Sequence, residues 1–193
     1  MTEAGRRARV EALAKINLGL KVLHRRPDGY HELRTVYQTI SLADAIDVEF
    51  SPARRTSVEV ASDADIPDNI VLRAAHLALE AMRVAARVRF QLHKRIPMGA
   101  GLGGGSSDAA AVLLALPALA RKPVPLARLL AIAAELGSDV PFFLTGGTAL
   151  GTGRGEEVYP LPDAPPRRGL LVAPPVHVST AEAYRSLARR LTT

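Results

Sequence analysis

The segment from Pro97 to Ser107 combines residue types and a spacing that suit phosphate chemistry. It contains five glycines and two serines, and it comes directly before the apolar run 109–116. Glycine reaches positive φ and leaves no Cβ between a ligand and the backbone N–H groups. A glycine loop that opens a helix also presents unpaired N–H donors and the positive end of the helix dipole. We therefore predict a phosphate-binding loop here rather than a flexible linker.

Three familiar loop types do not fit this segment. A Walker A loop ends in Gly-Lys-Ser/Thr, whereas this one ends in Gly-Ser-Ser. The dinucleotide pattern G-x-G-x-x-G is met formally from Gly99 to Gly104. No Asp or Glu lies between Asp108 and Glu135, however, where that fold needs an acidic group for the ribose. The protein-kinase motifs His-Arg-Asp and Asp-Phe-Gly do not follow either.

Two charged residues are candidates for catalysis, although each has an ordinary explanation. Lys15 begins the alternating segment 16–22, with Asn17 on the same polar face of a half-buried strand. A lysine in that place is usually a solvated surface charge. Asp139 lies in Gly-Ser-Asp-Val-Pro, just past a predicted helix and next to two phenylalanines. A carboxylate there is as often a helix cap or turn residue as a functional group.

Tyr30 and His31 follow the turn sequence Arg-Pro-Asp-Gly and are candidates for ligand recognition. Taken alone, an exposed Tyr-His pair is more often surface than site. The other four histidines have no metal-ligand spacing with one another, so we expect no histidine metal site; they are His24, His76, His93 and His177.

The hydrophobic periodicity indicates an α+β fold. The expected strands are 16–22, 32–40, 46–50, 57–60, 88–92, 147–152 and 169–173. The expected helices are 70–82, capped by Asn69, then 107–116, ended near Pro117, and 126–136. A Pro-rich connector is expected over 160–166.

Composition limits the class of protein. The chain has 193 residues, of which 48% are hydrophobic, so it has enough apolar residues for a sizeable core. The absence of cysteine excludes disulfides and thiolate metal sites and fits a cytoplasmic protein. We expect no signal peptide and no membrane helix. The net charge is +6, but the arginines are scattered and aromatics make up only 4%, so nucleic-acid binding is not supported.

The order of these motifs resembles the GHMP kinase superfamily, named for galactokinase, homoserine kinase, mevalonate kinase and phosphomevalonate kinase. Within it, the Pro-Asp-Gly-Tyr-His and Gly-Ser-Asp-Val-Pro blocks resemble the family that phosphorylates 4-diphosphocytidyl-2-C-methyl-D-erythritol. The resemblance extends from about Ala14 to Tyr184. The matching segments are 14–18, 27–31, 68–69, the glycine loop, 137–143 and 146–149.

The resemblance implies a GHMP-kinase fold with two domains. Residues 1–165 would form the N-terminal, ATP-binding domain, whose fold resembles that of a ribosomal-protein domain. Residues 166–193 would supply only the opening elements of the C-terminal domain, because family members continue well beyond that point. We therefore expect the C-terminal domain to be incomplete in this chain.

The resemblance also implies a reaction and a set of residues. The γ-phosphoryl of ATP, bound with Mg²⁺, would pass to the 2-hydroxyl of the cytidyl substrate in the non-mevalonate route to isoprenoids. Asp139 matches the base, and Lys15 matches the cation that keeps it ionised and screens the phosphoryl group. Tyr30 and His31 match the cytosine pocket. Mg²⁺ would be carried by the nucleotide and contacted by Ser107.

The remaining implied residues fall into two sets. Polar positions near the substrate are Asn17, Asn69 and Thr180. The ATP-binding residues are Pro97, Met98, Gly99, Ala100, Gly101, Leu102, Gly103, Gly104, Gly105, Ser106 and Ser107. Two alternatives stay open, namely another small-molecule kinase of the superfamily and a non-catalytic RNA- or ribosome-associated module. Salt-dependent RNA binding distinguishes the second from an enzyme.

Overall fold

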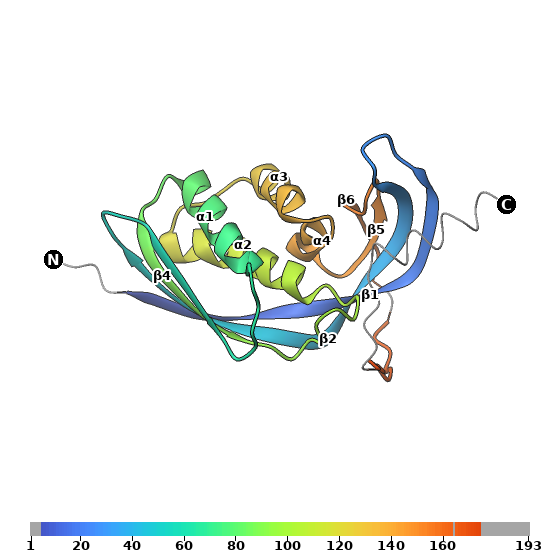
Figure 1. The fold of residues 1–193 in the computed structure, drawn as a ribbon, viewed down its shortest axis with the longest axis horizontal. Helices are drawn as coiled ribbons and strands as arrows, with labels where there is room; N and C mark the ends of the chain where they lie inside the picture. Colours follow the sequence, from blue (N-terminus) through green and yellow to red (C-terminus); the bar gives the residue numbers. More distant parts are fainter. Residues whose placement is uncertain (1–4, 164, 175–193) are drawn as a thin grey trace.

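A computed structural model describes residues 5–163 and 165–174 of the chain, and it has the predicted α+β architecture. Four helices lie on one face of a six-stranded sheet (Figure 1). The strand order is β3-β4-β2-β5-β6, and β1 pairs with β2 outside this path. The strands are β1 (Arg6–Arg25), β2 (His31–Pro52), β3 (Ser57–Ser62), β4 (Ala86–His93), β5 (Thr148–Thr152) and β6 (Glu157–Leu161). The helices are α1 (Ile70–Met82), α2 (Gly104–Ala120), α3 (Leu126–Leu136) and α4 (Val140–Thr145).

The long hairpin of β1 and β2 forms the backbone of the sheet. One end of β2 pairs with β4 and the other end pairs with β5, all antiparallel. The register between β1 and β2 has three irregularities, which lie between Leu13 and Lys15, between Asn17 and Gly19, and between Val22 and His24. At the far end of the hairpin the two strands curve up beside β5 and β6, to the side of the sheet on which the helices lie (Figure 1). The predicted separate strands 32–40 and 46–50 are therefore parts of one strand.

The predicted face of the first strand is wrong around Lys15. The segment was expected to bury its apolar residues and expose Lys15, but Leu18 is 60% exposed and Lys15 only 5%. A bulge between Leu13 and Lys15 breaks the alternation, so that consecutive Ala14 and Lys15 are both buried. The Lys15 N–H donates to the Leu102 carbonyl at 3.0 Å, because the glycine loop packs here.

The core lies between the sheet and the helices. Strand β4 alternates buried and exposed residues, with Val88, Phe90 and Leu92 among the buried ones. Helix α1 ends where Arg83 adopts a left-handed conformation, and it begins at the predicted cap, Asn69. The predictions for α1 and α3 are confirmed to the residue at each end.

Two predictions about the C-terminal half are wrong. Helix α2 does not end near Pro117 but runs on to Ala120. A proline removes only the hydrogen bond of its own N–H group. The last turn is still completed, because the Lys122 N–H donates to the Pro117 carbonyl. The predicted strand 169–173 has no regular structure, and Leu170 in it is 91% exposed. Strand β6 extends into the expected Pro-rich connector as far as Leu161, because its backbone pairs with that of β5.

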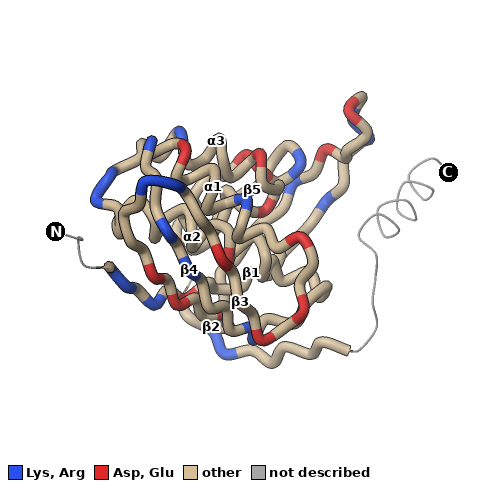
Figure 2. Tube along the Cα trace, turned by 60° about the vertical axis from the view of Figure 1, so that its left-hand side comes forward, with Lys and Arg blue, Asp and Glu red and all other residues tan. Residues whose placement is uncertain are grey.

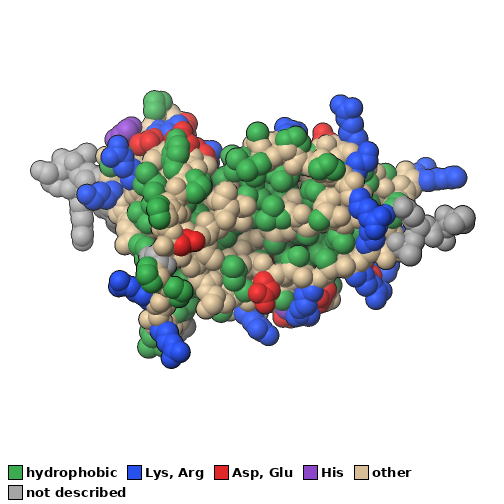
Figure 3. All heavy atoms as spheres, turned by 180° about the vertical axis from the view of Figure 1, so that it is seen from behind, with side chains coloured by type: hydrophobic (Ala, Val, Ile, Leu, Met, Phe, Trp, Pro, Cys, Tyr) green, Lys and Arg blue, Asp and Glu red, His purple; other side chains and the backbone are tan. Residues whose placement is uncertain are grey.

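The charged residues form no continuous basic stripe on the described part of the chain. Lys and Arg positions are interspersed with Asp and Glu positions along the trace (Figure 2). On the face opposite to that of Figure 1, basic side chains gather toward the two ends, and the middle is mainly apolar or uncharged (Figure 3). Within the described residues, no helix has the length and apolar character needed to span a membrane.

Leu113 and Leu114 provide a matched test of this core. Leu113 is fully buried in α2, whereas its neighbour Leu114 is 45% exposed. We expect Leu113→Ala to lower the free energy of unfolding by about 2–5 kcal/mol. Leu114→Ala should change it by no more than about 0.5 kcal/mol. Urea denaturation measures both, and equal losses would contradict the assigned orientation of α2.

Candidate active site

The glycine loop joins the end of β4 to the start of α2 and lines a cavity of about 390 Å³. Gly99, Gly101 and Gly103 have φ of 72°, 73° and 72°, which is the left-handed region that glycine tolerates best. Gly103 is also the N-cap of α2, and no side chain caps the N–H groups of the first turn. These N–H groups are therefore available to an anion in the cavity.

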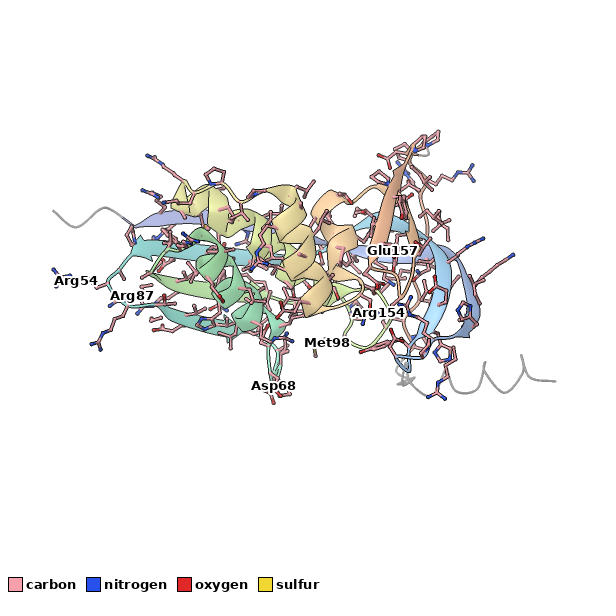
Figure 4. The ribbon with its side chains drawn as sticks, turned by 90° about the horizontal axis from the view of Figure 1, so that it is seen from above. Arg54, Asp68, Arg87, Met98, Arg154 and Glu157 are labelled. Carbon is pink, nitrogen blue, oxygen red and sulfur yellow. The ribbon has the colours of Figure 1, made fainter. Side chains whose placement is uncertain are left out.

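All but one of the predicted ATP-binding residues line this cavity. The exception is Ser107, which is 3% exposed and donates its hydroxyl hydrogen to the Leu13 carbonyl at 2.7 Å. Asn69 lines the cavity too, and its side-chain oxygen accepts the Val71 N–H at 3.0 Å. In Figure 4, Met98 from the loop and Asp68, which precedes Asn69, lie at the same edge of the molecule.

Lys15 and Asp139 lie together beside the end of the loop. Lys15 Nζ is 3.7 Å from Asp139 Oδ2, and only 7% of the lysine side chain is exposed against 35% of the aspartate side chain. Lys15 Nζ also donates to Asn17 Oδ1 at 2.7 Å. A cation held between two oxygen acceptors suits the stabilisation of charge on a transferred phosphoryl group. The structure therefore brings three of the predicted site residues into one cluster.

Helix α4 and strand β2 position Asp139. Asp139 is the N-cap residue of α4, and Pro141 lies two residues further on, in the first turn of this helix. Tyr37, on β2, donates its hydroxyl to Asp139 Oδ1 at 3.0 Å, and its ring centroid lies 5.6 Å from Lys15 Nζ. Tyr37 was not predicted as a site residue, because the period-two pattern of β2 marks it only as a buried strand residue.

Tyr30 and His31 lie at the turn of the β1–β2 hairpin, which contacts the turn between β5 and β6. The Arg154 guanidinium stands 4.7 Å from the centroid of the Tyr30 ring, and the Gly153 N–H donates to Glu32 Oε1 at 3.2 Å. Figure 4 shows Arg154 on this turn. The carbonyl of Gly155, in the same turn, is 3.4 Å from the Tyr37 hydroxyl. One short turn therefore contacts both the predicted base pocket and the Asp139 cluster.

A buried charge cluster under the glycine loop is a second feature that the sequence analysis missed. Lys94 Nζ bonds to Asp44 Oδ2 and lies 2.7 Å from Asp108 Oδ2. Asp44 Oδ1 accepts the backbone N–H groups of Arg95 and Ile96 at 2.5 and 2.8 Å, just before the loop begins. Burial raises the pKa of Asp108 to about 6, although the Lys94 ammonium opposes the shift. Asp44 therefore anchors the entry to the loop through charge-assisted bonds.

The structure brings no further predicted site residue into these clusters. Thr180 lies outside the described residues. In the described part of the chain, no group of three or more His, Cys, Asp or Glu side chains is arranged to hold a metal ion. The expected contact between Ser107 and Mg²⁺ therefore stays a prediction.

Substitutions at Gly103 and Gly101 distinguish the effect of steric contact from that of backbone strain. Both have positive φ, but a Cβ on Gly103 would come within 2.7 Å of Phe143 Cζ and 3.2 Å of Lys15 Cγ, whereas a Cβ on Gly101 would meet nothing within 4 Å. We expect Gly103→Ala to lower the free energy of unfolding by about 1–3 kcal/mol more than Gly101→Ala. Thermal or urea unfolding of the two variants tests this, and equal losses would mean that Phe143 moves aside freely.

The raised pKa of Asp108 predicts a pH-dependent stability. Between about pH 4 and pH 6 the unfolded state loses the Asp108 proton while the folded state keeps it, so the contribution of this group to stability falls as pH rises. Relative to the wild type, Asp108→Asn should therefore gain about 2 kcal/mol between pH 4 and pH 7. Urea denaturation across this range measures the gain, with the exposed Asp65→Asn as the control. A difference in unfolding free energy between Asp108→Asn and the wild type that does not change with pH would contradict the raised pKa of Asp108.

Comparison with known proteins identifies the superfamily. The family profile "GHMP kinases N terminal domain" matches residues 69–147. A 4-diphosphocytidyl-2-C-methyl-D-erythritol kinase from Solibacter usitatus is 61% identical over 186 residues, which cover 96% of this chain and 59% of that protein. The corresponding kinase from Geobacillus kaustophilus is 45% identical over 184 residues, with coverage of 94% and 63%. The chain thus spans less than two thirds of the length of these relatives.

Solved structures agree with this family assignment. A crystal structure of 4-(cytidine 5'-diphospho)-2C-methyl-D-erythritol kinase has a TM-score of 0.69 and 49% identity, and the match covers 80% of this chain and 55% of that one. A homoserine kinase from Cytophaga hutchinsonii, at 21% identity, shares the fold with a TM-score of 0.64 over 93% of this chain and 59% of that one. Residues 69–147 therefore carry the N-terminal domain of the GHMP kinases, and the chain shares the fold of solved members of that superfamily.

Proposed function

We propose that this protein transfers the γ-phosphoryl group of ATP to the 2-hydroxyl of 4-diphosphocytidyl-2-C-methyl-D-erythritol. The relatives that match almost the whole chain are named as kinases of this compound. The observation that carries the proposal is the position of the Lys15–Asp139 pair at the end of the glycine loop. Gly103 lies so close that a Cβ there would stand 3.2 Å from Lys15 Cγ. A phosphate held by the loop would thus lie next to a cation and a carboxylate.

The chemistry of the pair fits phosphoryl transfer to an alcohol. Asp139 would accept the proton of the acceptor hydroxyl as its oxygen forms a bond to the γ-phosphorus, while the bond from that phosphorus to the β–γ bridging oxygen breaks and ADP leaves. Lys15 would stabilise the negative charge that builds up on the phosphoryl oxygens. Both side chains are held in place before the substrates bind, because Asn17 and Tyr37 contact them.

The other predicted residues take supporting roles in this proposal. The backbone N–H groups of the glycine loop would hold the ATP phosphates, and residues 1–165 would form the nucleotide-binding domain. Mg²⁺ would neutralise phosphate charge. A contact between it and Ser107 would require that side chain to become accessible, because Ser107 is 3% exposed and does not line the cavity. Tyr30 and His31 would hold the cytosine at the other end of the turn that includes Gly155. The substrate would then extend along this turn from its cytosine base to its reacting hydroxyl.

An acceptor assay tests the reaction. ADP release by the purified protein should depend on the cytidyl substrate and should not be supported by mevalonate or homoserine at the same concentration. Release that depends equally on mevalonate would replace this proposal with another kinase of the superfamily. Release without any acceptor would show only ATP hydrolysis.

Two variants test the roles of Asp139 and Lys15. Asp139→Asn removes the proton acceptor but keeps the size of the side chain, so kcat should fall by about 10² or more with ATP affinity nearly unchanged. Lys15→Met should also lower kcat. If the pair acts as a unit, the kcat of the double variant should be little lower than that of the less active single variant. Lys21→Met, on the exposed end of β1, is the matched control. Steady-state kinetics and calorimetry measure these effects, and an Asp139→Asn protein with wild-type kcat would exclude the assigned base.

A further inference from the structure

The Asp139 carboxylate is held from two sides, by Lys15 and by Tyr37. Lys15 faces Oδ2 at 3.7 Å, while the Tyr37 hydroxyl donates to Oδ1 at 3.0 Å. The shorter contact is therefore the one to Tyr37. A carboxylate can rotate about its Cβ–Cγ bond unless one oxygen is fixed. The hydrogen bond from Tyr37 to Oδ1 therefore determines which oxygen faces Lys15.

Tyr37 is itself rigidly placed. The residue is 2% exposed, and its ring stacks on Phe142 with the centroids 4.8 Å apart. In the sheet, Tyr37 pairs with Ala149 of β5, so its backbone lies in a central ladder rather than at an edge. A buried aromatic ring with a fixed backbone and a stacked neighbour leaves its hydroxyl little freedom.

Two glycines make room for this tyrosine. A Cβ on Gly151 would come within 2.5 Å of Tyr37 Cε2, and a Cβ on Gly155 would collide with the Tyr37 hydroxyl. Gly155 also has φ of 108°, which L side chains rarely adopt. Its carbonyl lies 3.4 Å from the hydroxyl, so it competes poorly with Asp139 for the single hydrogen. The absence of side chains at Gly151 and Gly155 thus leaves the space in which the Tyr37 ring and hydroxyl reach the Asp139 carboxylate.

We infer that Tyr37 is a positioning residue of the phosphoryl transfer. Its hydroxyl holds Asp139 Oδ1, so that Oδ2 stays beside Lys15 and faces the acceptor hydroxyl. Tyr37 donates a hydrogen bond throughout and loses no proton; the acceptor proton passes to Asp139 alone. This inference rests on the proposed function, because it concerns the orientation of the carboxylate that acts as the base there.

Tyr37→Phe tests the inference, because it removes the hydroxyl but keeps the stacked ring. We expect kcat to fall about 5- to 50-fold, in line with the loss of one hydrogen bond to a charged group, and both KM values to stay within about twofold. Tyr159→Phe is the matched control, since Tyr159 lies on β6 and is 54% exposed. Its kcat should equal that of the wild type.

A double-mutant cycle separates positioning from a merely structural role. In the Asp139→Ala background no carboxylate remains to be oriented, so Tyr37→Phe should lower the residual rate no further. An equal loss in both backgrounds, or a Tyr37→Phe kcat within twofold of the wild type, would overturn the inference and leave the proposed function intact. A wild-type protein that does not phosphorylate the cytidyl substrate would instead overturn the proposed function, and the inference with it.

Discussion

The antiparallel pairing of β1 with β2 is the constraint on which the rest of the molecule depends. Strand β2 also pairs with β4 near one end and with β5 near the other, so one strand connects both halves of the sheet. The hairpin also carries Lys15, Asn17, Tyr37 and Asp44, four of the polar residues that surround the candidate site. A shift of β1 against β2 by one residue would turn the side chains of one strand to the opposite face relative to those of the other.

Buried charges are tolerated in this fold because each has partners. Lys94 lies between Asp44 and Asp108, and its pKa is raised because the hydrogen bonds to the two carboxylates outweigh its burial. Lys15 is held by Asn17 and Asp139. Removing one partner from such a group leaves an uncompensated buried charge, which costs more than the pair contributes. The two clusters lie on either side of the glycine loop, so the loop is held at its entry and at its exit.

The turn between β5 and β6 connects the two parts of the candidate site. Through Arg154 and Gly153 it contacts the hairpin residues Tyr30 and Glu32, and through Gly155 it reaches Tyr37. A ligand that reaches from Tyr30 to Asp139 therefore follows protein surface that is already ordered. Such preorganisation reduces the entropy lost on binding. In the proposed function, the cytosine base and the reacting hydroxyl of one substrate would occupy the two ends of this surface.

Local sequence was enough to predict the elements whose signals are local. The cap at Asn69, the apolar stripe of α1, the boundaries of α3 and the glycine loop all follow from neighbouring residues. The motif order also identified Lys15 and Asp139 as candidates, but their contact, the burial of Lys15 and the role of Tyr37 depended on the tertiary structure. A β-bulge reverses the alternation at Lys15, and long-range strand pairing brings Tyr37 to Asp139. Neither effect leaves a local signal, because each arises from contacts between residues far apart in the chain.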